Sequence, residues 1–64
     1  MTIKELAAHV HPAMRIQILD GGGWTAPVIE EKKAGDIQQS DDNFYRLSVI
    51  QDFRILPGDI KICI

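Results

Sequence analysis

Few residues in this 64-residue chain have the types and the spacing that chemistry requires. His9 and His11 form a His-x-His pair, and Cys63 is the single thiol that could join them as a metal ligand. Histidines two positions apart at a helix end do not converge on one ion, and zinc sites need three or four protein ligands. We therefore expect no metal site and no cofactor, with solvated histidines and Cys63 acting as a small apolar side chain.

The residues that catalysis or phosphate binding would use are also poorly placed. None of the hydroxyl side chains lies in the strand–turn–helix setting of a nucleophile elbow. The triple glycine at 21–23 is followed by Trp24 rather than by a helix with a lysine and a hydroxyl residue. It therefore predicts a hairpin turn and not a phosphate-binding loop. From these absences we expect a protein that is not an enzyme.

Recognition through an outer surface suits the residues better. Trp24, the only tryptophan, follows the glycine turn, and Phe44 lies at a position that predicts exposure. Aromatic side chains often anchor interfaces, although Trp24 could instead cover one end of a thin core. Arg15, Arg46 and Arg54 occupy polar positions of different predicted strands. On neighbouring strands they would share one face, which suits an acidic or nucleic-acid partner or is an ordinary solvated face.

Composition limits the class of protein. With 45% hydrophobic and 25% charged residues, the chain is typical of one folded domain over residues 1–64. Seven basic against nine acidic residues give a net charge of −2, which disfavours binding to nucleic-acid phosphates. One cysteine excludes an internal disulfide, and no apolar run approaches the roughly 20 residues of a membrane span. The start lacks the features of a signal peptide, so we expect a cytoplasmic protein without a membrane partner.

The first element predicted is a short helix that begins at Thr2. Thr2 and Glu5 form the S/T-x-x-E capping box, in which each side chain accepts a hydrogen bond from a backbone N–H of the other residue. An apolar stripe follows at helical spacing, and Pro12 ends the helix at about Val10 or His11. Since so short a helix does not persist alone in water, the stripe must dock on a sheet.

Alternating apolar and polar residues predict the strands. Residues 14–20 alternate cleanly, and a second strand is expected at 24–29, where Pro27 indicates an edge strand or a bulge. The polar stretch 30–43 predicts a long mobile loop, with at most an irregular strand around Ile37.

A longer β pattern returns at Phe44 and is interrupted near residues 50–52, which suggests a bulge or a bend. Pro57-Gly58 predicts a type II turn into a last strand at 60–64. Nothing in the sequence covers that apolar strand, so unless it lies in the centre of the sheet, a homodimer through this strand as an edge is a reasonable expectation. The core side chains predicted for the long strand are Tyr45, Leu47, Val49, Phe53 and Ile55.

These elements together predict a mainly β, α+β fold with a short N-terminal helix packed on a small, strongly curved antiparallel sheet. Short connections favour antiparallel neighbours, and the curvature favours an SH3-like barrel. The alternative is a flatter helix-on-sheet unit whose sheet does not close.

The two ends of the chain resemble a group of short proteins encoded by phages and prophages of Gram-positive bacteria. The resemblance lies in the T-[IV]-K-E-L opening at residues 2–6, the strand at 14–20 and the aliphatic strand at 60–64. It covers about half of the chain, while the middle part through residue 43 departs from the pattern. Some small phage proteins of this size are anti-CRISPR or other anti-defence inhibitors, so the resemblance implies such a role. It carries over no site residue.

The sequence therefore predicts a non-enzymatic binding module whose partner is a protein. The alternative is a small nucleic-acid-binding β-barrel that uses the arginine face. The residues expected to meet the partner are Trp24, Phe44, Arg15, Arg46 and Arg54.

Overall fold

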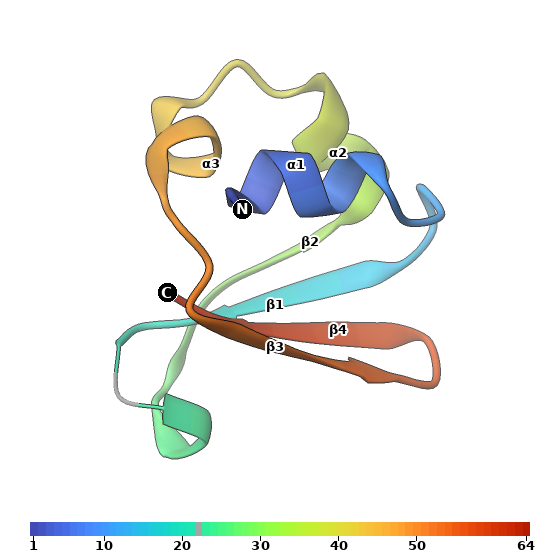
Figure 1. The fold of residues 1–64 in the computed structure, drawn as a ribbon. Helices are drawn as coiled ribbons and strands as arrows, with labels where there is room; N and C mark the ends of the chain where they lie inside the picture. The colour runs from blue at the N-terminus through green and yellow to red at the C-terminus, as the bar shows by residue number, and fades with distance from the viewer. Residues whose placement is uncertain (22) are drawn as a thin grey trace.

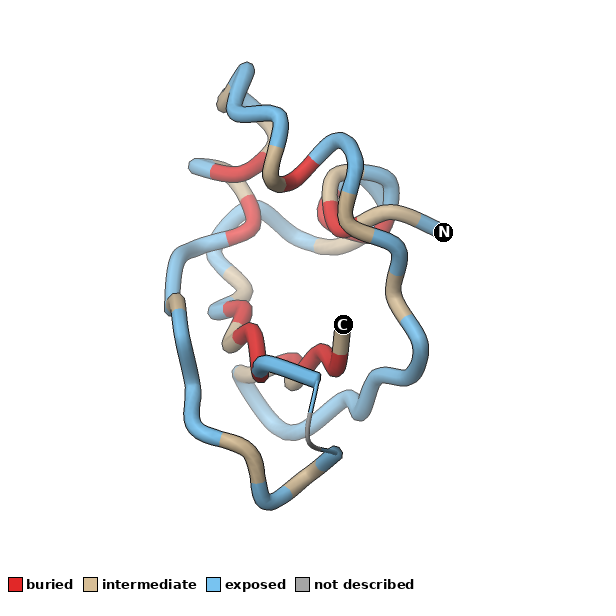
Figure 2. Tube along the Cα trace, turned by 90° about the vertical axis from the view of Figure 1, so that its left-hand side faces the viewer, coloured by how far each residue is buried: buried red, intermediate tan, exposed pale blue. Residues whose placement is uncertain are grey.

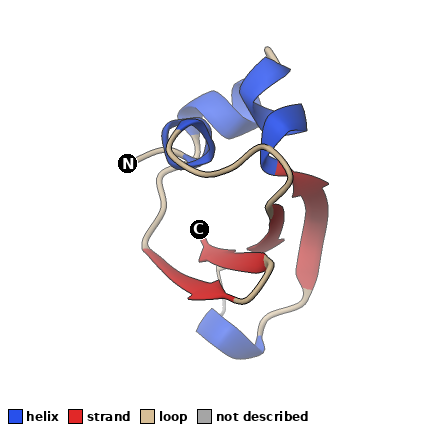
Figure 3. Ribbon diagram, turned by 90° about the vertical axis from the view of Figure 1, so that its right-hand side faces the viewer, coloured by secondary structure: helices blue, strands red, loops and turns tan. Residues whose placement is uncertain are grey.

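The computed structural model describes residues 1–21 and 23–64 as a helical layer on one side of a four-stranded sheet. A short 3₁₀ helix, η1, lies on the other side of the sheet (Figures 1 and 3). None of the described helices, the longest of which have six residues, could cross a bilayer. The element order is α1 (Ile3–Ala8), β1 (Arg15–Leu19), η1 (Gly23–Thr25), β2 (Val28–Lys33), α2 (Ala34–Gln39), α3 (Asn43–Leu47), β3 (Asp52–Leu56) and β4 (Asp59–Cys63).

The sheet is mixed and open, with strand order β2-β1-β4-β3. β1 pairs antiparallel with β2, and β3 pairs antiparallel with β4. The two central strands, β1 and β4, run parallel. The α+β class is confirmed, but the SH3-like barrel is not, because β2 and β3 are two separate edges and the sheet does not close.

Two topological predictions were wrong. The sheet is not wholly antiparallel, because α2 and α3 lie in the chain between the two hairpins, and so long a connection allows a parallel central pair. The C-terminal strand is not an uncovered edge, because β4 lies between β1 and β3. Its apolar alternation is that of a central strand, which the sequence pattern alone does not distinguish from an edge.

The N-terminal helix forms as predicted. The Thr2 hydroxyl accepts a hydrogen bond from the Glu5 N–H at 3.2 Å, and the Glu5 carboxylate accepts one from the Thr2 N–H at 3.0 Å. α1 ends at Ala8, close to the position that Pro12 indicated. The capping box therefore fixes where the helix begins, and its apolar side docks on the sheet.

The first hairpin is confirmed, but its second strand lies further along the chain than predicted. β1 occupies the expected residues, whereas β2 begins only at Val28 and Trp24 lies in η1. Gly21 and Gly23 have φ of 56° and 76°, which turn the chain away from the sheet before β2. Gly22 of the predicted turn lies outside the described residues. β2 is an edge strand, as Pro27 indicated.

The polar stretch 30–43 is not one long loop, and this prediction was wrong. Its first part continues β2 to Lys33, and α2 follows at once with Ala34 and Ile37 buried one turn apart. The Gln38 side-chain amide donates to the backbone carbonyl oxygens of Ala7 and Val10, which ties α2 to α1. Contacts distant in sequence hold this helix, so its own residues give little signal.

The long strand predicted from Phe44 was also wrong in its first part. Residues 43–47 form α3, and the Asp42 carboxylate caps it by accepting from the Phe44 N–H at 2.9 Å. β3 begins at Asp52, within the predicted interruption. Of the core residues predicted here only Tyr45 is buried, while the other four are exposed: Leu47, Val49, Phe53 and Ile55.

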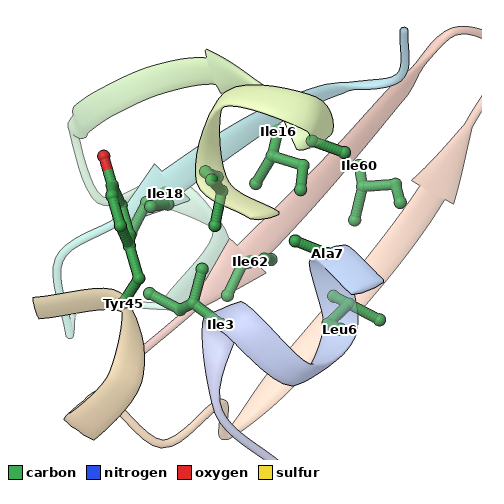
Figure 4. Packing of buried hydrophobic residues seen from close by; sticks show 10 residues of the cluster. Ile3, Leu6, Ala7, Ile16, Ile18, Tyr45, Ile60 and Ile62 are labelled. Atoms are coloured by element: carbon green, nitrogen blue, oxygen red, sulfur yellow. The ribbon is translucent and has the colours of Figure 1, made fainter. Parts of the chain in front are cut away.

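The main core lies between the helical layer and the two central strands (Figure 4). Ile16 lies opposite Ile60, and Ile18 lies opposite Ile62, so four isoleucines face the helices. The predicted turn before β4 is confirmed, with Gly58 at a φ of 78°, a conformation that glycine adopts without strain. The helices add Ile3, Leu6, Ala7, Ala34, Ile37 and Tyr45 to this core.

Candidate functional site

Trp24 and Arg54, two of the residues predicted to meet a partner, come together on the face of the sheet that is turned away from the helices, here called the open face. The guanidinium carbon of Arg54 lies 4.2 Å from the centroid of the Trp24 ring. η1 supplies Trp24 and β3 supplies Arg54. A cation over an indole that remains in contact with solvent contributes about 0.5–1 kcal/mol, so this contact helps to hold η1 on the sheet.

The open face also has an apolar end, on the side of the sheet where η1 lies. Leu19 and Cys63 lie opposite one another on β1 and β4, in the row of paired residues next to that of Arg54, and both are buried. They do not belong to the main core. We infer that the η1 segment covers them, since it lies on that side of the sheet (Figure 1). Trp24 is half-buried, which fits either sequence interpretation, as core cover or as surface aromatic.

Arg15 lies on the same face but is engaged by carboxylates. Its Nε atom is 3.3 Å from Glu31 and 3.7 Å from Asp59. Glu31 also accepts a hydrogen bond at 3.1 Å from Gln17, its neighbour across the β1–β2 pair. The open face is therefore a mixture of charges and not a uniformly basic surface.

Phe44 and Arg46 do not join this group, because both lie on α3 in the helical layer. Phe44 is half-buried against the core, and its ring meets that of Tyr45 edge-on at 5.6 Å between centroids. Arg46 is exposed in the last turn of α3. The predicted face of three arginines thus contains only two of them, since the third lies on a helix and not on a strand.

The sequence interpretation missed the exposed apolar side chains of β3. Phe53 is 41% exposed and Ile55 is 66% exposed, although both lie on the helix-facing side, opposite the buried Ile62 and Ile60. The chain leading into β3 is also exposed along most of its length (Figure 2). The alternation of β3 resembles that of a core strand, so no local signal reveals that the helices leave this edge uncovered.

We call Trp24, Phe53, Arg54 and Ile55 the β3 edge surface. It combines an unpaired strand edge, two apolar side chains on one face and a stacked guanidinium on the other. Strand edges of this kind pair readily with another chain unless charges or covering elements prevent it.

At the opposite edge, Tyr45 lies buried beneath β2. Its hydroxyl has no hydrogen-bond partner within residues 1–21 and 23–64, and the Lys32 ammonium lies 5.6 Å from its ring centroid. Burial raises the pKa of Tyr45, and the nearby Glu30 carboxylate adds to the effect. The neutral phenol therefore belongs to the folded state, and a charged phenolate would destabilise it.

The potential metal ligands lie apart. His9 caps the end of α1, the Nδ1 atom of His11 accepts from the Ala13 N–H at 3.0 Å, and Cys63 is buried in β4. Within the described ranges no three histidine, cysteine or acidic residues gather into a metal-binding group, and these ranges enclose no pocket. Comparison of the chain with protein-family models, curated proteins and solved structures found no match.

Proposed function

We propose that this chain is a non-enzymatic protein-binding module and that the β3 edge surface is where its partner binds. The main support is the exposure of Phe53 and Ile55 on an edge strand whose outer side pairs with no other strand of the described chain. Burying such side chains contributes about 25 cal/mol for each Å² removed from water, which binding to another protein would supply. The segment before β3 exposes two more apolar side chains, Leu47 and Val49.

The resemblance to phage proteins extends the proposal to an anti-defence inhibitor that occupies the surface of a bacterial protein. A nucleic-acid partner is less well supported, because Arg15 is already held by two carboxylates and the chain carries a net negative charge. Binding to DNA or RNA that weakens steeply as salt rises would favour that alternative instead.

The test is capture of a partner from a bacterial lysate with matched variants. Ile55→Lys places a charge on the β3 edge, whereas Ile29→Lys places the same charge at an exposed position of the other edge strand. We expect the wild type and Ile29→Lys to retain the same protein and Ile55→Lys to lose it. Retention of that protein by Ile55→Lys, or of no protein by the wild type, would contradict the proposal.

A further inference from the structure

The outer backbone of β3 is arranged to accept another strand. The Phe53 N–H donates to the carboxylate of Asp52 at 2.8 Å and so does not take part in the ladder with β4. In an antiparallel pair, hydrogen-bonding groups alternate between the partner strand and the free side. Phe53 and Ile55 are two positions apart and therefore both direct their backbone groups outward. An added strand would replace the local Asp52 contact with ladder hydrogen bonds.

Two positive charges lie directly opposite one another next to this edge. Arg54 pairs with Lys61 across β3 and β4. Neither has a carboxylate within ion-pair distance in the part of the chain described; the ion pairs there belong to Arg15 and Lys32. Like charges opposite one another destabilise a sheet, whereas opposite charges stabilise it. An acidic side chain on a strand added beside β3 would lie opposite Arg54 and compensate this repulsion.

The guanidinium of Arg54 is held in place for such a contact. It lies over the Trp24 ring, and stacking on an aromatic face leaves the in-plane N–H donors of arginine free to bind a carboxylate. Because the side chain is already restrained, less conformational entropy is lost on binding. Trp24 therefore acts on the partner through Arg54.

The residues on either side of Arg54 determine which other side chains a bound strand should carry. Phe53 and Ile55 flank Arg54 in sequence but project to the other face, where both are exposed. A strand opposite them would carry apolar residues on that face and the acid between them. We propose that the β3 edge binds an extended segment of a partner protein in which a glutamate or aspartate lies between two apolar residues, with the acid facing Arg54. This inference rests on the proposed function.

A second copy of the chain fits the edge less well. Full antiparallel overlap of two β3 strands would place Arg54 against Arg54 of the second copy, with Lys61 next to each, so that four cations lie in one row. Shifting the register to centre on Phe53 would pair Arg54 with Asp52 but would leave only residues 52–54 of each strand overlapping. The charges therefore favour a different chain, and self-association becomes an outcome of the test.

The probes are three capped synthetic peptides with the core Thr-Val-X-Val-Thr, in which X is Glu, Gln or Lys. Each is titrated into the full ¹⁵N-labelled chain at low salt, with amide shifts as the readout. We expect the Glu peptide to move the amides of Phe53 and Ile55 and to bind about five- to tenfold more tightly than the Lys peptide. Arg54→Glu should reverse this order. Arg46→Glu, which makes the same charge change at an exposed position of α3, should not.

Equal binding of all three peptides, or no shift at Phe53 and Ile55 with any of them, would overturn the inference. Shifts of these amides on raising protein concentration without peptide would also overturn it, in favour of a second copy. Arg54→Gln, which removes the charge without adding another, separates charge pairing from misfolding. If lysate capture is lost in Ile55→Lys but kept in Arg54→Glu, the proposed function stands and the acidic-strand inference fails. If neither variant affects capture, both fail.

Discussion

The two edge strands of the sheet differ in how they meet solvent. β2 is rich in charge, with a Glu30–Lys32 ion pair at 3.6 Å, and it lies beside α2 and over Tyr45. β2 exposes Val28 and Ile29 at its start, whereas β3 exposes Phe53 and Ile55 in its middle and carries only two charged residues. Charged residues, lysine above all, are a common protection of edge strands against unwanted pairing. The contrast teaches that charges protect the β2 edge better than the β3 edge, and it directs the search for a partner to β3.

The first way to test this contrast compares two isoleucines that face each other across β3 and β4. Ile60 is buried and Ile55 is 66% exposed. We expect Ile60→Ala to lower the free energy of unfolding by about 2–5 kcal/mol, because it opens a cavity in the core. Ile55→Ala should change it by about 0.5 kcal/mol or less. Urea denaturation measures both, and equal losses would mean that β3 is covered in the free protein.

The second prediction concerns what Trp24 contributes beside β3. Trp24→Ala should lower the free energy of unfolding by about 1–3 kcal/mol, since the half-buried indole packs on the sheet and stacks on Arg54. It should also speed the reaction of the buried Cys63 thiol with a thiol reagent. Trp24→Phe, which retains an aromatic ring, is the control. Unchanged thiol reactivity in Trp24→Ala would show that η1 does not cover the open face.

A smaller loss of stability is expected from a substitution at the start of α1, which contacts the segment that leads into β3. Thr2 forms an isolated antiparallel bridge with Val49, and the Ile50 N–H donates to the Met1 carbonyl at 2.8 Å. Thr2→Ala should therefore lower the free energy of unfolding by about 1 kcal/mol through loss of the cap. Hydrogen exchange should quicken at the Ile50 amide but not in β2. Equal acceleration of hydrogen exchange at Ile50 and in β2 would contradict a specific effect of the Thr2 cap on the segment that leads into β3.

The same cap predicts a dependence on pH. Hydrogen bonds from the Thr2 backbone and side chain lower the pKa of Glu5 below its ordinary value of 4.5. A lowered pKa means that the stabilisation is complete above the ordinary pKa and is lost as the pH falls through the lowered one. Thermal melts should therefore show that the difference in melting temperature between the wild type and Glu5→Gln becomes smaller as the pH is lowered to about 3. A constant difference would contradict the capping role.

The smallest effect on stability at neutral pH is expected at the β2 edge. Tyr45→Phe removes a hydroxyl that has no hydrogen-bond partner in the described structure, so the free energy of unfolding should change by about 0.5 kcal/mol or less. Because burial raises the pKa of Tyr45, the wild type is fully stable below the ordinary tyrosine value of 10.0 and loses stability as the pH rises above it. Thermal melts at alkaline pH should therefore show a smaller loss of stability for Tyr45→Phe than for the wild type.

Local signals identified much of the fold. The capping box and the apolar stripe placed α1, clean alternation placed β1 and β4, and Pro57-Gly58 placed the final turn. α2 was missed, because contacts from α1 support it. α3 was missed because Phe44 to Leu47 alternate like a strand, and the Asp42 cap that starts the helix was not recognised.

The candidate site likewise has features that local sequence patterns predicted and others that only the tertiary structure determined. The sequence alone identified Trp24 and Arg54 as surface residues of interest, because an isolated tryptophan and a polar strand position are local facts. Their contact at 4.2 Å depends on η1 folding beneath a sheet whose strand order no local pattern specifies. The exposure of Phe53 and Ile55 was likewise decided by tertiary structure. A strand's alternation determines which residues share a face, but only the packing of helices over the sheet determines whether that face is covered.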